Sequence, residues 1–359
     1  MSLAWLLVLL QLKSWTLADT KELQIPLRTI EKITLPGNGS LILTLDQDPQ
    51  ADDAFWTFEA HSQNNNDRLS FSRSPNAIPR AFYSKLKAHN HPGLVVTSSE
   101  LVNSTRPRVF LNNWSERNVT LILLARNYTS KHPIPGYSSG NLNENGISLN
   151  YDADLVRIEF ALASVLNASK VGSPILTYEV YQQYLTEQDY DQDQFLARLS
   201  LSMLKLDDIT KNGRLIDANF VVHNKNNDSF VFSAYPGTGV IFSVVVTTLY
   251  PGLNGTDDLL FSTAYVSTAT YSCQFENTHP LNCKFMWTTI SKVIFGFSIF
   301  IGAFVAFFGH RCFQLQQFFV GAYAFGLFGF IVFSVLLDSI SYTERMGISI
   351  GVGLVGKLF

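Results

Sequence analysis

Cysteine is scarce in this chain, with three residues among 359, and this excludes a small domain held together mainly by disulfides. Cys273 and Cys283 lie ten residues apart, ahead of an apolar C-terminal part. We expect them to form a disulfide, because glycosylation sequons earlier in the chain indicate an oxidising compartment. Closing so short a loop stabilises a fold by about 2–3 kcal/mol on the chain-entropy estimate. We expect Cys312, between two apolar segments, to stay reduced.

The chain also lacks a surplus of charge of either sign. Its formal net charge is −3, from 26 Lys and Arg against 29 Asp and Glu, so we expect no basic stripe that binds nucleic acid. Charged side chains nearly vanish after Lys292, and no asparagine follows it. The five that remain are Arg311, Asp338, Glu344, Arg345 and Lys357. This break in composition separates a polar N-terminal part from a membrane part.

Three apolar segments follow the break, and we expect them to be membrane helices. The first covers residues 290–309, the second 318–337, and the third starts at 346 and runs to 359. A helix needs about 20 residues to cross the bilayer, so the third segment is too short; we expect a truncated chain, and a re-entrant segment is the alternative. Small residues let helix backbones approach closely in lipid. The glycines that we expect at helix contacts are Gly321, Gly347 and Gly351.

The first 18 residues are typical of a secretory signal peptide. Leu3 to Leu12 is an apolar core too short to span a bilayer, and small residues up to Ala18 suit a cleavage site. A buried strand is the alternative. The loop between the first two apolar segments carries Arg311 and no acid, which places it in the cytosol. The N-terminal part is therefore expected on the luminal or extracellular side.

Sequons for N-glycosylation support this orientation. Eight Asn-x-Ser/Thr sequences precede the composition break and none follows it. They are Asn38, Asn103, Asn113, Asn118, Asn127, Asn167, Asn227 and Asn254. Asn118 is the doubtful site, because a segment expected to be a buried strand follows it and Asn113 competes nearby. We expect a glycoprotein of the secretory pathway, at the plasma membrane or the endoplasmic reticulum.

Strand-like runs dominate the polar part, bounded by Gly, Asn, Pro and Asp. The runs are 40–45, 55–60, 108–111, 119–125, 156–163, 175–180, 220–222, 229–234, 240–248 and 264–274. They predict a mainly β luminal ectodomain of two antiparallel β-sandwiches, followed by an α-helical transmembrane region. We expect the sandwiches at 19–135 and 146–285, divided by a loop rich in Pro, Gly, Ser and Asn.

One helix is expected inside the second sandwich. Asp191 or Asp193 can cap its N-terminus, and apolar residues recur at helical spacing after them. The expected apolar face consists of Phe195, Leu196, Leu199 and Met203.

Several short motifs resemble reactive or metal sites but lack the required context. Residues 136–140 match a nucleophile elbow, yet a Pro-rich loop replaces the strand that must precede it. Residues 189–193 begin like a calcium loop without its glycine and glutamate. His89 and His91 share a strand face, but Pro92 follows and no third ligand is near. We therefore expect no catalytic, cofactor-binding or metal-binding residues.

Motifs in the second half carry a resemblance to a known family. They are Tyr178-Glu179-Val180-Tyr181, Pro236-Gly237, Thr270 to Glu276 and, most densely, Ser291-Lys292-Val293 through His310-Arg311. From about residue 146 to 337 the chain resembles the seven-transmembrane superfamily member three family of animals. The resemblance implies a signal peptide, a glycosylated β-rich ectodomain and seven spans. It also implies roles in cell survival and in damping endoplasmic-reticulum stress, without an established biochemical activity.

We therefore expect a non-enzymatic, multi-pass membrane glycoprotein. Besides the lipid bilayer, its expected partner is a luminal or extracellular protein or glycan, and no cofactor is expected. The alternative is a component of a transporter or channel that works through its Gly-rich helix bundle. A lipid-hydrolysing membrane enzyme is a third reading, and it would need clustered His, Asp or Ser near the spans.

Overall fold

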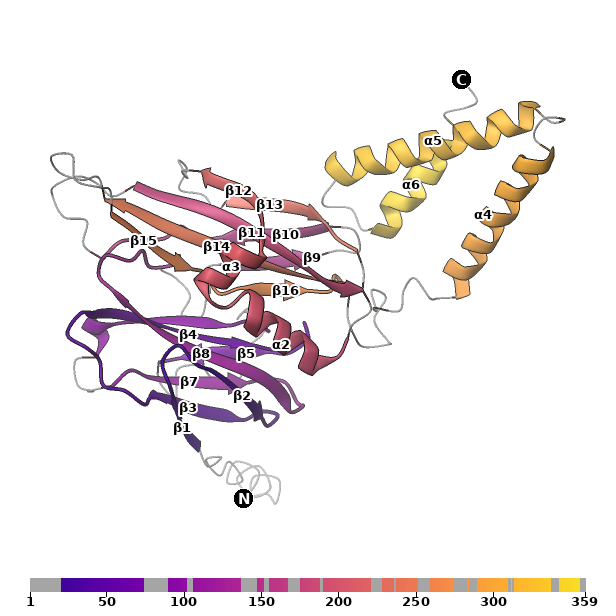
Figure 1. Ribbon diagram of the computed structural model, residues 1–359. Helices are drawn as coiled ribbons and strands as arrows, with labels where there is room; N and C mark the ends of the chain where they lie inside the picture. The colour runs from indigo at the N-terminus through magenta and orange to yellow at the C-terminus, as the bar shows by residue number, and fades with distance from the viewer. Residues whose placement is uncertain are drawn as a thin grey trace, which may run out of the picture. The chain divides into compact units, whose positions relative to one another are not determined.

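The computed structural model describes most of the chain as strands followed by three helices (Figure 1). The described residues are 21–73, 90–101, 106–136, 147–151, 155–166, 175–187, 190–220, 228–235, 237–250, 259–273, 275, 283, 289–308, 311, 313–336 and 342–355. The expected signal peptide and four sequons, Asn103, Asn167, Asn227 and Asn254, lie outside them.

The first sandwich consists of two four-stranded sheets. One sheet has the order β1-β3-β7-β5, with β1 at Lys21–Ile25, β3 at Ser40–Leu45, β7 at Arg108–Asn113 and β5 at Leu69–Ser72. The other has the order β2-β8-β4-β6, with β2 at Ile30–Leu35, β8 at Val119–Thr129, β4 at Asp53–His61 and β6 at Gly93–Thr97. A short 3₁₀ turn, η2, covers Ser98–Glu100.

The two sheets enclose one apolar core. Alternate residues of each strand face inward, as the two-residue period of a strand requires. Leu43 and Leu111 come from one sheet, and Trp56, Phe58 and Leu121 come from the other. The pair β1–β3 is parallel, whereas β3–β7, β5–β7, β2–β8, β4–β8 and β4–β6 are antiparallel.

The second sandwich pairs a five-stranded sheet with a three-stranded one. The larger sheet has the order β12-β11-β14-β15, with β16 also paired to β14. Its strands are β12 Arg214–Phe220, β11 Ile175–Glu187, β14 Thr238–Tyr250, β15 Leu259–Ala264 and β16 Thr268–Thr270. The smaller sheet has the order β13-β10-β9, with strands β13 Asp228–Ser233, β10 Leu155–Phe160 and β9 Ile147–Tyr151.

Aromatic rings join these two sheets. The ring of Phe160 on β10 lies 5.6 Å from that of Tyr178 on β11 and 5.7 Å from that of Tyr265 after β15. The hydroxyl of Tyr178 accepts a hydrogen bond from the backbone N–H of Ala163, so this buried phenol has a polar partner.

Two helices follow β11, namely α2 at Gln192–Ser202 and α3 at Leu206–Asn212. Asp191 is the N-cap of α2, because its Oδ1 accepts a hydrogen bond from the backbone N–H of Gln194 at 2.9 Å. The predicted apolar face is buried, which confirms it. Its members are Phe195, Leu196, Leu199 and Met203.

Most strands lie where the sequence predicts them, but the run 264–274 does not form one strand. The chain leaves β15 at Ala264 and re-enters the sheet at β16, so two short strands pair with different parts of β14. Ser267 lies between them, and its hydroxyl donates to the carbonyl of Met203 while it contacts the hydroxyl of Ser243. These side-chain bonds compete with the sheet ladder and divide the strand.

The chain forms two compact units. One contains Met1–Leu149, Ile158–Ser229 and Val240–Thr270, and therefore most of both sandwiches. The other contains Asn150–Arg157, Phe230–Gly239 and Tyr271–Phe359. The second unit includes the disulfide between Cys273 and Cys283, which confirms the predicted pairing.

The second unit ends in three apolar helices. They are α4 at Thr289–Phe308, α5 at Phe313–Leu336 and α6 at Tyr342–Val355. By length and composition, among the described residues only α5 is suited to cross a bilayer, over Gln316–Phe333, and the apolar stretch of α4 is the shorter Ser298–Phe308. The expected limits of the two sandwiches and three spans stay predictions.

Helix α6 packs on α5 through glycines. A Cβ on Gly353 would lie 2.4 Å from the carbonyl oxygen of Ala322 and 3.1 Å from the backbone of Gly326. A Cβ on Gly347 or Gly351 would meet no described atom within 4 Å, so these two glycines do not face α5 and their role in packing stays a prediction. The small-residue pattern identifies a close contact but not the side of the helix that makes it.

Replacing Gly353 by leucine should separate α5 from α6. The side chain would overlap the α5 backbone, and such overpacking costs about 1–3 kcal/mol. Gly351→Leu is the matched control, because its side chain would enter open space. The measurement uses the detergent-solubilised chain with one cysteine placed on each of the two helices, and it follows the yield of cross-linking between them during thermal unfolding. G353L should lower this yield. Equal yields for both variants would contradict the packing.

Candidate functional site: a polar seam between the two sandwiches

The outer face of the sheet β2-β8-β4-β6 is buried, although one face of such a sheet is usually solvated. Along β4, Trp56 and Phe58 point into the core of the first sandwich. The alternate residues Glu59 and His61 point the other way and are still only 2 % and 0 % exposed. Hydrogen bonds from this face reach backbone carbonyls of the second sandwich in the same compact unit. The second sandwich therefore covers it.

Ionisable and amide side chains lie on this covered face. We call Glu59, His61, Asn90, His91 and Arg126 the polar seam. Arg126 on β8 donates from Nη1 to Oε1 of Glu59 at 2.5 Å and from Nη2 to the carbonyl oxygen of Leu204, between α2 and α3. Burial, the largest single effect, would lower the pKa of Arg126, but Glu59 and Tyr128 together outweigh burial and the pKa is raised. The guanidinium stays charged and joins both sandwiches.

Two histidines continue the seam. Oε2 of Glu59 lies 3.4 Å from Nε2 of His61, and Nδ1 of His61 lies 3.2 Å from Nδ1 of His91. On its other side, Nε2 of His91 is 3.0 Å from the amide nitrogen of Asn90 and 3.3 Å from the carbonyl oxygen of Ala269 on β16. The tautomers of the two rings decide which atom donates in each contact. The pair thus connects the carboxylate of the first sandwich to the backbone of the second.

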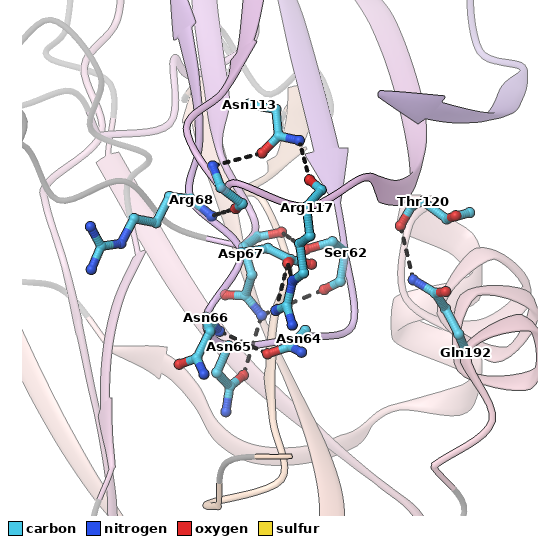
Figure 2. A network of polar contacts seen from close by, with 12 residues as sticks. Ser62, Asn64, Asn65, Asn66, Asp67, Arg68, Asn113, Arg117, Thr120 and Gln192 are labelled. Atoms are coloured by element: carbon cyan, nitrogen blue, oxygen red, sulfur yellow. Dashed lines mark hydrogen bonds and ion pairs between the residues drawn. The ribbon is translucent and has the colours of Figure 1, made fainter. Parts of the chain in front are cut away.

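The loop at residues 62–68 forms a second polar network beside the seam (Figure 2). Asp67 accepts hydrogen bonds from Nε and Nη2 of Arg117 at 3.0 and 2.9 Å. Burial nonetheless raises the pKa of Asp67, because desolvation outweighs the attraction of Arg117. The network fixes the loop from which Asn65 donates to Oγ1 of Thr270 and Gln63 to the carbonyl oxygen of Tyr190.

Contacts at the rim of the same face are more exposed. Nζ of Lys32 on β2 lies 2.7 Å from Oδ1 of Asp193 on α2. Figure 2 shows Gln192 directed at Thr120, and its amide donates to the Thr120 carbonyl oxygen at 3.1 Å. The exposed ion pair contributes about 0–1 kcal/mol.

His132 packs between aromatic rings at another part of the rim. Its ring lies 5.3 Å from that of Tyr128 on β8 and 5.3 Å from that of Phe261 on β15. Burial lowers the pKa of His132 and raises the pKa of Tyr128, so burial favours the neutral form of both rings.

Four of the predicted glycosylation sites lie among the described residues, and they differ in exposure. Asn38 and Asn118 are exposed, and Asn118 accepts a hydrogen bond from the backbone N–H of Gly37. Asn127 is half-buried on β8, between Arg28 and Asp53.

Asn113 is 0 % exposed, and its geometry does not fit a glycan. Its amide nitrogen, the atom that would carry the sugar, donates to the carbonyl oxygens of Leu35, Pro36 and Arg117. Its Oδ1 accepts from the backbone N–H of Ser115. The side chain of Asn113 instead holds two loops together, and which of the sequons carry glycans stays a prediction.

Some residues of the short motifs that resemble reactive or metal sites lie in the described part of the chain, and there they make structural contacts. His91 belongs to the polar seam, and His89 lies outside the described residues, as does Asp189. Among the described residues, no group of three or more His, Cys, Asp or Glu side chains is placed to hold a metal ion. Asp48 pairs with Arg106 at 2.6 Å on the surface.

Sequence reasoning singled out His91, as a metal-ligand candidate, but missed the rest of the polar seam. The pattern gave no signal of it, because Trp56 to His61 alternates apolar and polar residues as a half-solvated strand does, although its polar face is buried. Its one acid, Glu59, has its partner on β8, at Arg126. Pairing two residues so far apart in the sequence requires the register of the two strands, which the pattern does not supply.

Comparisons with known proteins match both sandwiches. The model described as "TM7SF3-like, N-terminal immunoglobulin-like domain" matches residues 21–128. The model described as "TM7SF3-like, second immunoglobulin-like domain" matches residues 133–276. A solved beta-1,2-glucanase from Parabacteroides distasonis overlaps 65% of this chain and 32% of its own, at 10% identity and a TM-score of 0.18, which is too low for any inference.

Curated relatives agree with the family models. Transmembrane 7 superfamily member 3 of Homo sapiens is 29% identical over 328 residues, which cover 85% of this chain and 52% of the relative. The protein of the same name from Mus musculus is 28% identical over 324 residues, covering 85% and 53%. The chain spans about half the length of these relatives. It belongs to the TM7SF3-like family and carries that family's two immunoglobulin-like domains ahead of its apolar helices.

Proposed function

We propose that this chain is a non-enzymatic, multi-pass membrane glycoprotein whose ectodomain binds a protein or glycan on the luminal or extracellular side. Two immunoglobulin-like domains ahead of apolar helices support a binding ectodomain on a membrane anchor. The names of the relatives describe membrane proteins and no reaction. By resemblance to the family, the binding function serves cell survival and attenuates endoplasmic-reticulum stress.

Exposed apolar residues on two edge strands carry the proposal of a binding surface. In the five-stranded sheet of the second domain, β12 and β15 stand at the two ends of the strand order. Leu215 and Ile216 on β12 and Leu259 and Leu260 on β15 are all exposed, with Leu260 at 64 %. Edge strands present free backbone donors and acceptors, so natural proteins usually protect them with charges or cover them. Apolar edges of this kind suit a partner that adds a strand.

A photoreactive residue at position 215 or 260 of the full chain should cross-link to a discrete partner in living cells. Position 201 on α2 is the matched control, because Leu201 is an apolar residue with 71 % exposure that lies off both edges. In addition, Leu260→Glu should weaken capture of the partner at least about tenfold, equivalent to about 1.4 kcal/mol.

Equal adducts at all three positions, or none, would count against a partner at these edges. In that case the helix bundle becomes the better candidate for the working part.

The glycoprotein part of the proposal has its own test. We predict that Asn38 and Asn118 carry glycans and that Asn113 does not, because only the first two have an accessible side chain. Asn118→Gln should increase the gel mobility of the protein expressed in the secretory pathway by the equivalent of one glycan. Asn113→Gln should leave the pattern unchanged and destabilise the first domain by about 1–3 kcal/mol, since buried carbonyls lose their donor.

Glycopeptide mass spectrometry and thermal unfolding of the two variants provide the measurements. A glycan on Asn113 in the folded protein would show that the described packing of its side chain is wrong.

A further inference from the structure

The contact between His61 and His91 limits how many protons the two rings can hold. Each imidazole has two nitrogens, so two separate rings bind at most four protons. Here Nδ1 of one ring faces Nδ1 of the other at 3.2 Å, and a hydrogen bond between them holds one proton for two nitrogens. The joined pair therefore holds at most three ring protons. Both side chains are buried, so water cannot separate them without movement of the domains.

The groups around the pair come from both domains. From the first domain, β4 supplies Glu59 beside His61, and β8 supplies Arg126, which binds the same carboxylate. The adjoining loop supplies Asp67, whose charge is paired with Arg117. From the second domain, the carbonyl oxygen of Ala269 on β16 and the ring of Phe195 on α2, at 6.5 Å, lie against His91.

His91 is also the part of the pair that reaches the second domain. Its neighbour Asn90 donates to Oδ1 of Asn65, and Asn65 donates to Oγ1 of Thr270 on β16. Separating the rings would therefore disturb both contacts to β16, from His91 to the carbonyl oxygen of Ala269 and from Asn65 to Thr270. The proton count of the pair is thus coupled to the docking of the two domains.

We infer that the His61–His91 contact is an acid-sensitive contact between the two immunoglobulin-like domains: it holds them together at neutral pH and releases them as the pH falls. Protonation of histidine pairs at interfaces is an established way in which proteins respond to acidification. This inference concerns regulation of the ectodomain and does not depend on which partner it binds.

The sign of the pH dependence follows from the proton count. The docked pair holds at most three protons and the separated pair holds four in acid, so opening takes up at least one proton. A state that binds more protons gains population as the pH falls. Docking is therefore favoured at neutral pH and weakened as the pH falls. Each extra proton changes the opening equilibrium about tenfold per pH unit.

Hydrogen exchange of the full chain in detergent tests the inference. Exchange in β4 and β16 is compared at about pH 7.5 and about pH 5, after correction for the intrinsic rate. We expect the opening equilibrium of these two strands to rise about tenfold per pH unit below about pH 6, whereas β3 and β7, in the other sheet of the first domain, stay constant.

The variant His91→Gln removes one ring of the pair and keeps a donor for the Ala269 carbonyl. Opening of this variant should therefore take up one proton fewer, and the opening equilibrium should depend less steeply on pH. The variant His132→Gln measures how much the histidine at the rim contributes to the pH dependence of opening, since burial also favours the neutral form of that ring. The inference requires the larger loss of slope in H91Q. It is overturned if exchange in β4 and β16 of the unmodified chain is independent of pH, or if H91Q keeps the full slope. If H91Q does not fold, the unmodified chain alone decides.

Discussion

The ion pair of Glu59 and Arg126 is the constraint on which the arrangement of the ectodomain depends. A charge removed from water is tolerated only when its remaining hydrogen-bonding groups are satisfied. Glu59 and Arg126 satisfy each other, but the second terminal nitrogen of Arg126 has its partner at Leu204 of the other domain. Removing the second domain would expose this face to water and take away the carbonyl of Leu204 to which Arg126 donates. The two domains are therefore linked electrostatically as well as by apolar contact.

Buried polar groups also make this interface specific. Apolar faces can slide on each other, whereas Arg126, His91 and Asn65 each require a particular acceptor on the second domain. A buried salt bridge by itself adds little net stability, because desolvation offsets the attraction. The role that fits these contacts is alignment. Two domains aligned in this way present the exposed edges of β12 and β15 in a constant geometry within one compact unit.

Much of the fold follows from local patterns in the sequence. β3 begins and ends where alternation predicts it, and Asp191 caps the helix whose apolar face was expected. The features that were missed depend on contacts between distant segments. Asn113 reads as an ordinary sequon, but its side chain bonds to two loops that meet only in the folded domain. Gly347 and Gly353 look alike in sequence, yet only Gly353 faces α5. The polar seam needs the pairing of β4 with β8 and the docking of a second domain.

The most direct test of this account is native-state hydrogen exchange of the full chain in rising concentrations of denaturant. If the buried face of β4 and β8 joins the two immunoglobulin-like domains, their core strands should lose protection together, at one denaturant concentration. β4 and β8 report on the first domain, and β14 and β16 report on the second. Loss of protection in β14 and β16 at a lower concentration, with β4 and β8 still fully protected, would show that the domains are independent and would contradict the account.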